Sequence, residues 1–268
     1  MYTSSSFDKI NMTPQKIAIA YYTMLRAEFV RIIRIWSQTL LPPIVTTTLY
    51  FVVFGKFIGS QLAPIDGFAY IQFIVPGLIM MAVITSSYMN TVSTFYFAKW
   101  TRTLDEILVS PMPNWAVTLG FVSGGVLRGL LVGVLVLIVS LFFTHLAVFN
   151  IAILILAAVL TSVLFSLGGL INGVFAKGFD GISIVPTFVL TPLTYLGGIF
   201  YSIDQFSPFW QTVSLFNPIL YMINAFRYGF LGISDINIWV CFGVLLGMLA
   251  LFVGIILYLF RQGIGVKN

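Results

Sequence analysis

The chain has 268 residues, of which 59% are hydrophobic and only 8% are charged, and its formal net charge is +5. Soluble globular domains carry about 25% charged residues, so this composition excludes a water-soluble protein and indicates a membrane protein. Helices are the expected spanning elements, because backbone groups cannot face lipid unpaired and the sequence lacks the alternating pattern of barrel strands.

Six apolar stretches are long enough to cross a bilayer, since a spanning helix needs about 20 mostly apolar residues. The predicted spans are about 39–59, 69–97, 115–143, 149–176, 182–201 and 237–260. Pro76-Gly77 is expected to break the second span. The predicted fold is an all-α polytopic membrane protein with six transmembrane helices in a domain of residues 38–268.

The basic residues predict the orientation of these spans. Six spans place both termini on one side of the membrane, and ten of the 13 Lys and Arg residues would lie there. Lys56 and Arg227 would lie on the other side, and Arg128 inside a span. Because cytoplasmic loops carry the excess of Lys and Arg, we expect both termini in the cytoplasm. The ten residues are Lys9, Lys16, Arg26, Arg31, Arg34, Lys99, Arg102, Lys177, Arg261 and Lys267.

The N-terminal segment, residues 1–37, is expected to be cytoplasmic and retained, because it lacks the short apolar core of a signal peptide. Within it, residues 15–37 predict an amphipathic helix whose basic side, with Arg31 and Arg34, lies on the anionic inner leaflet.

At the other side of the membrane, residues 202–236 are too apolar for a solvated loop and are interrupted by Pro208 and Asn217-Pro218. They predict two short re-entrant helices in the outer leaflet.

A short charged stretch, AKWTRTLDEILVSPMPNW at residues 98–115, separates the second and third spans on the cytoplasmic side. Read as a helix from about 99 to 109, it is amphipathic and is ended by prolines. Its charged side holds Lys99, Arg102 and Glu106, and its apolar side holds Trp100, Leu104, Ile107, Leu108 and Pro111. Two interpretations stay open: a helix in the lipid headgroup region, or a docking surface for a soluble partner.

The sequence carries no motif of a catalytic or metal-binding site: there is no GxxxxGK[ST], HExxH or GxSxG motif and no cluster of Cys and His. We therefore predict no catalytic residue, no metal and no cofactor in this chain, which is not expected to be an enzyme. All eight acids fall outside the apolar segments. This argues against an ion-coupled carrier, because proton- or sodium-coupled transport usually needs buried carboxylates. The energy for transport is expected to come from another chain.

Five stretches spread over nearly the whole sequence carry a family resemblance. They are LLPPIVTTTLYFVVFG at 40–55, YIQFIVPGLIMMAVIT at 70–85, SLGGLINGVFAKGFD at 166–180, ISIVPTFVLTPLTYLGGIFYS at 182–202 and FNPILYMINAFRYGFLG at 216–232. Together they resemble the permease subunit of type-2 ABC exporters. The resemblance implies a homodimer of six-helix subunits in the bacterial inner membrane. It also implies two copies of a separate cytoplasmic ATPase, which binds ATP and Mg; no nucleic-acid partner is expected.

The resemblance also implies roles for three segments. The loop between the second and third spans would be a coupling helix that docks on the ATPase. Its docking residues would be Trp100, Arg102, Leu104, Asp105, Glu106, Ile107 and Leu108. The helix at 15–37 would be the connecting helix, which also touches the ATPase, and residues 203–232 would be the re-entrant outer helices.

Two polar stripes within the spans are candidates for the translocation pathway. Related exporters line their path with the fifth span, where the stripe holds Thr187, Thr191, Thr194 and Tyr195. The second span carries a similar stripe of Ser86, Asn90 and Ser93. The alternative for the threonines is that they bond to carbonyls freed by Pro186 and Pro192.

Small residues and one buried charge complete the prediction. Glycines repeat every four residues at 125, 129 and 133 and again at 169 and 173, which indicates close helix packing within a subunit rather than at a dimer seam. Arg128 is the one charge deep in a span, and such a residue is costly. We expect it to have neutral partners, Ser162 and Ser166, and a structural role.

The predicted function is therefore the permease subunit of an ABC exporter that moves an amphipathic or lipid- or glycan-like substrate out of the cytoplasm. A membrane scaffold whose charged loop recruits a partner other than an ATPase is the alternative.

Overall fold

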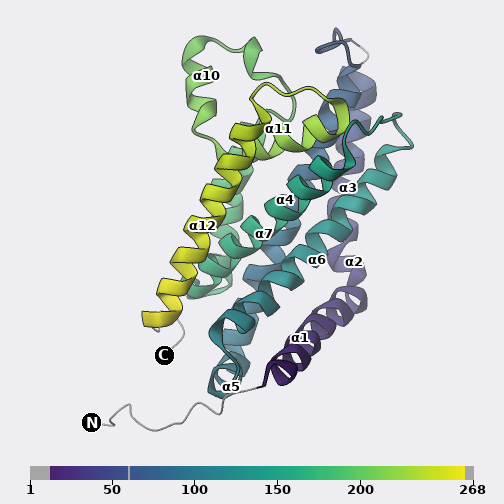
Figure 1. Ribbon diagram of the computed structural model, residues 1–268. Helices are drawn as coiled ribbons and strands as arrows, with labels where there is room; N and C mark the ends of the chain where they lie inside the picture. The colour runs from purple at the N-terminus through teal and green to yellow at the C-terminus, as the bar shows by residue number, and fades with distance from the viewer. Residues whose placement is uncertain (1–12, 60, 263–268) are drawn as a thin grey trace.

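Five long apolar helical segments run side by side through the molecule (Figure 1). The computed structural model describes residues 13–59 and 61–262. Within them, the segments long and apolar enough to cross a membrane are Trp36–Ile58, α4 (Tyr70–Trp100), α6 (Asn114–Ser140), α7 (Ile151–Phe175) and α12 (Ile238–Gln262). The first consists of α2 (Trp36–Thr39), α3 (Leu41–Tyr50) and the π-helical η1 (Phe51–Ile58). The chain is thus a multi-pass helical membrane protein.

The central helix of the bundle is α4, which packs against α6, α7 and α11 (Pro218–Leu231). It contains Pro76 but continues through it, so the expected break at Pro76-Gly77 does not occur. The bare Gly77 backbone instead lets α4 approach the chain at Ile199, whose Cα would lie 3.0 Å from a Cβ at position 77. Contacts with α6, α7 and α11 therefore hold α4 helical through the proline.

Glycines on α6 and α7 bring both helices against α4, which confirms packing within the subunit. A Cβ at Gly125 would lie 2.8 Å from the backbone oxygen of Ser87, and one at Gly169 would lie 2.5 Å from that of Tyr88. A Cβ at Gly133 would lie 2.7 Å from the Cγ2 atom of the Val83 side chain. Small residues at this spacing let helices approach closely, and each of these three glycines lies against α4.

The segment predicted as the fifth span is shorter than expected. It comprises α8 (Phe179–Val185), the π-helical η2 (Pro186–Leu190) and α9 (Thr191–Tyr195). These consecutive stretches of seven, five and five residues fall below the length of the five spanning segments. The helix ends early because the chain turns after Tyr195, where Gly198 takes a φ of +76° that favours glycine.

Two helices at the far end follow this turn. After the short 3₁₀ turn η3 (Ile203–Gln205), α10 (Pro208–Leu215) and α11 each begin with a proline in the first turn. The Oδ1 atom of Asn217 accepts a hydrogen bond from the Ile219 backbone N–H at 3.1 Å and so caps α11. The α11 helix is buried against α4, α7 and α12, whereas α10 projects at the end of the bundle (Figure 1).

The N-terminal helix α1 (Pro14–Arg34) lies along α6. The Tyr21 hydroxyl bonds the Ser123 hydroxyl at 2.7 Å, and the Met24 side chain fills the space beside Gly120. The start of α1, the end of α12 and the short helix α5 (Thr103–Val109) all lie at one end of the bundle, opposite α10 (Figure 1). Asp8, Lys9 and Lys267 lie outside the described residues.

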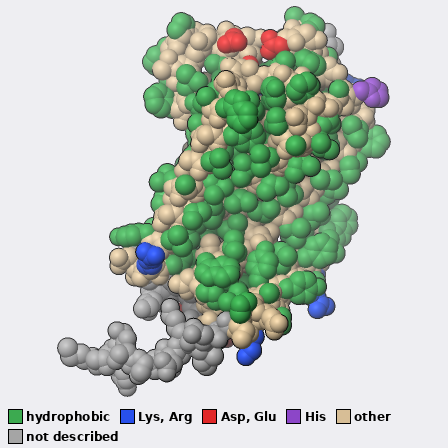
Figure 2. Space-filling model, in the orientation of Figure 1, with side chains coloured by type: hydrophobic (Ala, Val, Ile, Leu, Met, Phe, Trp, Pro, Cys, Tyr) green, Lys and Arg blue, Asp and Glu red, His purple; other side chains and the backbone are tan. Residues whose placement is uncertain are grey.

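On the face shown in Figure 2, charge differs between the two ends of the molecule. Figure 2 shows hydrophobic side chains covering the middle of one face, with Lys and Arg at the end that carries α5 and Asp and Glu at the opposite end. An apolar band between polar ends is the surface that a bilayer requires.

Candidate functional site

The exposed surface of α5 is the clearest candidate for contact with another protein. The predicted helix from 99 to 109 is split: Lys99 and Trp100 belong to α4, and α5 begins after Arg102, whose φ is +61°. Side chains that face outward are those of Trp100, Arg102, Asp105, Glu106 and Val109, with Val109 87% exposed. We call these five residues the α5 surface.

Leu104, which was predicted to dock a partner, faces the bundle instead. It is 1% exposed and belongs to a core cluster with Phe95, Val117 and Leu170. Ile107 is half-buried against the same cluster, and the side chain of Leu108 lies outside the described part of the chain. A two-turn amphipathic helix must bury its apolar side somewhere, and here that side anchors α5 to the permease.

Aromatic and polar contacts join the end of α4, just before α5, to neighbouring helices. The Trp100 ring packs edge-on against Phe97, 5.8 Å away, and against Phe179 at the start of α8, 5.6 Å away. The Lys99 ammonium donates a hydrogen bond to the Val174 carbonyl at 3.0 Å, near the end of α7. A cation at that position suits the negative end of the helix dipole. The end of α4 that leads into α5 is therefore packed against both α7 and α8.

A second polar site joins α1 to α4 and α6. Arg31 Nη2 lies 2.6 Å from Glu28 Oε2 and 2.9 Å from Asn90 Oδ1, and Asn90 Nδ2 donates to Glu28 Oε2 at 3.3 Å. The Glu28 side chain is 12% exposed and lies against Gly124 of α6. Arg31 thus points into the bundle rather than toward lipid headgroups, and Glu28 is enclosed by α1, α4 and α6, which corrects the expectation that it lies outside the apolar part of the protein.

Arg128 bonds the end of α2, just before α3, and the predicted partners Ser162 and Ser166 are wrong. Its Nη2 donates to the Thr39 carbonyl at 3.0 Å, while Ser162 Oγ bonds the Val159 carbonyl of its own helix at 2.8 Å. The reason is geometric: Gly125 of α6 faces Ser166, and Arg128 lies on the side of α6 that meets α1 to α3.

The two predicted pathway stripes do not share one open face. On α4, Ser86 is 3% exposed and Asn90 is 1% exposed, and Ser93 Oγ bonds the Met89 carbonyl at 2.6 Å. These side chains serve contacts inside the subunit, because α4 is surrounded by other helices.

The stripe on the shorter fifth segment is largely open. Thr187 and Thr191 are exposed, and Tyr195 is 37% exposed, with its hydroxyl bonded to that of Tyr50. Thr194 is buried and donates to the Leu190 carbonyl at 2.9 Å, and Thr191 donates to the Pro186 carbonyl at 2.9 Å. Thr191 and Thr194 therefore bond backbone carbonyls of their own helix, but neither acceptor is, as the alternative interpretation had expected, a carbonyl that Pro186 or Pro192 leaves without its helical donor.

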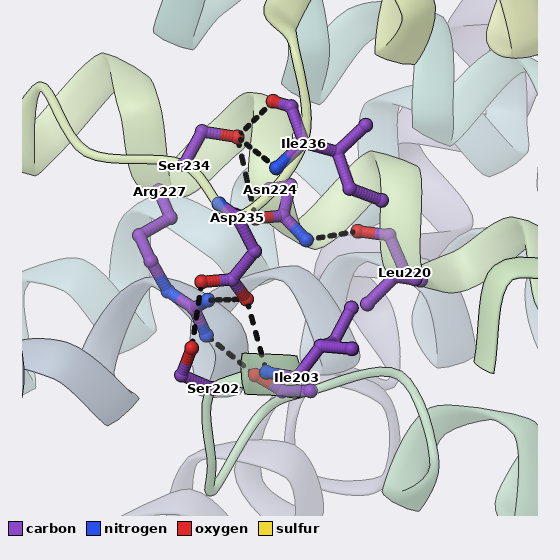
Figure 3. Close-up of polar contacts among 9 residues, drawn as sticks. Ser202, Ile203, Leu220, Asn224, Arg227, Ser234, Asp235 and Ile236 are labelled. Carbon is purple, nitrogen blue, oxygen red and sulfur yellow. Dashed lines mark hydrogen bonds and ion pairs between the residues drawn. The ribbon is translucent and has the colours of Figure 1, made fainter. Parts of the chain in front are cut away.

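A buried ion pair at the far end was missed from the sequence (Figure 3). Arg227 of α11, predicted to be an outer-side charge, is 1% exposed, and its Nη1 lies 3.6 Å from Asp235 Oδ2, whose side chain is 6% exposed. The guanidinium also donates to the Gly198 carbonyl and lies 3.8 Å above the centre of the Phe73 ring. The Asp235 carboxylate accepts from the Ser202 hydroxyl at 2.8 Å.

Asn224, one turn earlier on α11, completes this network. Its Oδ1 accepts from the Asp235 backbone N–H at 2.9 Å and from the Ser234 hydroxyl at 3.3 Å, and its Nδ2 donates to the Leu220 carbonyl at 3.0 Å. The signal in the sequence was Asn224 and Arg227 three residues apart in an otherwise apolar helix. Asp235 is thus a buried carboxylate whose charge is compensated by Arg227.

Comparison with known proteins assigns the family. The model of the family described as ABC-2 type transporter matches residues 19–231. The Inner membrane transport permease YadH of Escherichia coli (strain K12) is 53% identical over 250 residues, which cover 93% of this chain and 98% of that relative. Nodulation protein J of Rhizobium leguminosarum bv. viciae is 24% identical over 200 residues, which cover 74% of this chain and 76% of that relative. The chain therefore belongs to the ABC-2 type transporter family, as a membrane permease subunit without an ATPase site of its own.

Proposed function

We propose that this chain is the transmembrane subunit of an exporter in the bacterial inner membrane, and that a separate ATPase drives it by docking on the α5 surface. The observation that carries the proposal is that α5 and the residue before it expose three charges, Arg102, Asp105 and Glu106, while Leu104 on the other side of the helix is buried in the bundle. A helix that only rested on anionic lipid would favour Lys and Arg alone, whereas mixed charges suit a protein partner.

The proposed assembly contains two copies of this chain and two copies of the ATPase, which binds ATP and Mg. Both termini face the cytoplasm, because the end of the bundle with α5 also carries most of the exposed basic residues, whereas Lys56 is exposed at the other end. In addition to the five long segments, residues 179–195 cross the membrane, as the fifth of six membrane-crossing elements in chain order. The helices α10 and α11 lie in the outer half of the membrane. Support comes from the family match and from the charge separation along the bundle.

The proposed mechanism passes force through packed side chains. When ATP draws the two ATPase subunits together, the two α5 helices move with them. Leu104 joins α5 to the cluster around Phe95 and Val117, and Trp100, at the end of α4 just before α5, packs against Phe179 on α8. The motion therefore reaches α4, α6 and α8 and alternately opens the permease dimer to the two sides.

The proposed pathway follows the open side of the fifth segment, at Thr187, Thr191 and Tyr195. Its mixed hydroxyl and apolar character suits an amphipathic or a lipid- or glycan-like substrate. Thr191→Trp is expected to leave the complex assembled and able to hydrolyse ATP but unable to export a fluorescent amphipathic lipid from proteoliposomes. Normal export by this variant would remove Thr191 from the path.

The decisive experiment compares ATP hydrolysis by the purified complex in lipid nanodiscs. An ABC-type ATPase of the same organism is co-expressed and co-purified with wild type, with Glu106→Arg and with Val109→Asp on the α5 surface. A matched control is Asp204→Arg, which changes an exposed acid at the opposite end. We expect both α5 variants to lose co-purification or stimulated hydrolysis and the control to retain both.

An unchanged activity in both α5 variants would show that α5 is only an interfacial helix. The same holds if no ATPase co-purifies with any form of the chain. In either case the chain would be better described as a membrane scaffold that recruits another partner.

A further inference from the structure

A cavity of about 340 Å³ lies between the end of α9, the turn after η3 and α10. Six apolar residues line it: Leu193, Leu196, Phe206, Trp210, Val213 and Phe216. Ser214 and Asn217 are the two polar residues in the lining, and no charged residue takes part. Sites for small ligands have volumes of roughly 300–1,000 Å³ and are mostly apolar, so the cavity is large enough to hold part of a molecule.

The polar groups of the lining leave little for a polar ligand to bind. Both polar atoms of the Asn217 side chain are already hydrogen-bonded within the protein, because Nδ2 donates to the Leu193 carbonyl at 2.7 Å and Oδ1 caps α11. Ser214 adds a single hydroxyl. A charged or strongly polar ligand would lose its hydration on entering and would find almost no partner to replace it. The lining therefore selects a hydrocarbon.

The mouth of the cavity also suits a hydrocarbon. Leu196 is 46% exposed, Trp210 51% and Phe216 84%, and Phe209 beside them is 69% exposed. A large exposed apolar patch of this kind marks a binding surface or a surface that faces lipid. With α10 in the outer half of the membrane, as proposed above, acyl chains are the molecules that meet such a surface from outside, and none of these residues places a charge in their way.

We infer that this cavity is a binding site for one acyl chain of a membrane lipid, seated between α9 and α10. The site does not depend on the direction of transport or on the identity of the ATPase. As a consequence, a bound acyl chain fills the space between α9 and α10. It thereby supports the end of the fifth segment, next to Thr194 and Tyr195.

The test is photo-cross-linking of the full-length protein in nanodiscs that contain phosphatidylethanolamine with a diazirine on one acyl chain. Cross-linked peptides are mapped by mass spectrometry. In the wild-type protein we expect residues 193–217 to be labelled more strongly than the exposed apolar side of α12, which includes Leu246 and Leu251. Equal labelling of the two regions would overturn the inference without any need for a variant.

Two substitutions on α10 sharpen the test. Val213→Trp fills the cavity, and we expect it to lower labelling of residues 193–217 about tenfold, since losing contact with two methylene groups already weakens binding by that factor. Leu215→Trp makes the same kind of change on the same helix outside the lining and is expected to leave labelling unchanged.

Val213→Ala keeps the cavity open and guards against misfolding of the larger variant, so its labelling should match that of the wild type. Undiminished labelling of Val213→Trp would overturn the inference. The inference would also be overturned if the cavity of the wild-type protein were not labelled and Val213→Trp dissociated a dimer. A second copy of the chain would then be the occupant of the cavity.

Discussion

Arg31 on the N-terminal helix and Asn90 in the middle of α4 are joined by a hydrogen bond of 2.9 Å, although 59 residues separate them in the chain. Glu28 bonds both side chains, so the three form a closed polar group between α1 and α4. The contact makes α1 part of the bundle. It also gives Asn90, a candidate pathway residue by its position in the sequence, a role inside the subunit.

Loss of the Asn90 amide is expected to destabilise the protein. Asn90→Leu keeps the size of the side chain but leaves Arg31 and Glu28 without their shared partner, at a cost of about 1–3 kcal/mol. The measurement is the apparent Tm of the purified protein in detergent. Thr85→Leu, at an exposed position of the same helix, is the control and should change the Tm little. Equal Tm values for the two variants would remove the structural role of this network.

The buried Asp235 is expected to matter more than any exposed acid. Asp235→Ala leaves the Arg227 guanidinium, which is 1% exposed, without its counter-charge, and breaking a buried pair in this way costs about 3–5 kcal/mol. Thermal unfolding in nanodiscs checks the loss. Asp204→Ala, an exposed acid at the same end, should be nearly neutral. If Asp235→Ala unfolds at the wild-type temperature, the pair does not hold α11 to the loop before α12.

Two glycines with opposite surroundings test the close packing of α7 on α4. Gly169→Ala places a Cβ 2.5 Å from the backbone oxygen of Tyr88, so the helices must separate, at a cost of about 1–3 kcal/mol. Gly247→Ala on α12 meets nothing within 4 Å and should stabilise the helix by up to about 1 kcal/mol. Apparent Tm values should therefore move in opposite directions, and a shift of the same sign in both would contradict the packing seen here.

The two faces of α5 should separate stability from coupling. Leu104→Asp places a charge in a core position that is 1% exposed, and a loss of about 3 kcal/mol or more is expected. Glu106→Arg changes only an exposed charge and should leave the Tm within the error while it weakens the stimulation of the ATPase. The Tm and the hydrolysis rate of both variants, measured on the same preparations, distinguish the two roles. A normal Tm for Leu104→Asp would mean that Leu104 does not anchor the helix.

The sequence by itself determined the class of the protein and most of its helices. Long apolar runs can be solvated only by a bilayer, and helical backbone is what such runs require, so α4, α6, α7 and α12 follow from composition and length. The glycine repeats predicted tight packing inside the subunit because spacing along a helix defines a face. The family resemblance, carried by stretches over nearly the whole chain, was confirmed.

Only the tertiary structure decided which side of each helix meets which neighbour. From the sequence, Leu104 and Ile107 could contact either a partner protein or the helix bundle. In the structure they pack against the bundle, because the apolar side of α5 faces the core cluster. Arg128 could turn toward α7 or toward α2, and Thr39 of α2 receives it because glycines let α4 and α7 occupy the other side. Arg227 and Asp235 stand eight residues apart in the chain, across a turn at Gly232, and only the return of the chain toward α12 brings them together. A charge that looks exposed in a sequence is buried when the fold supplies its partner.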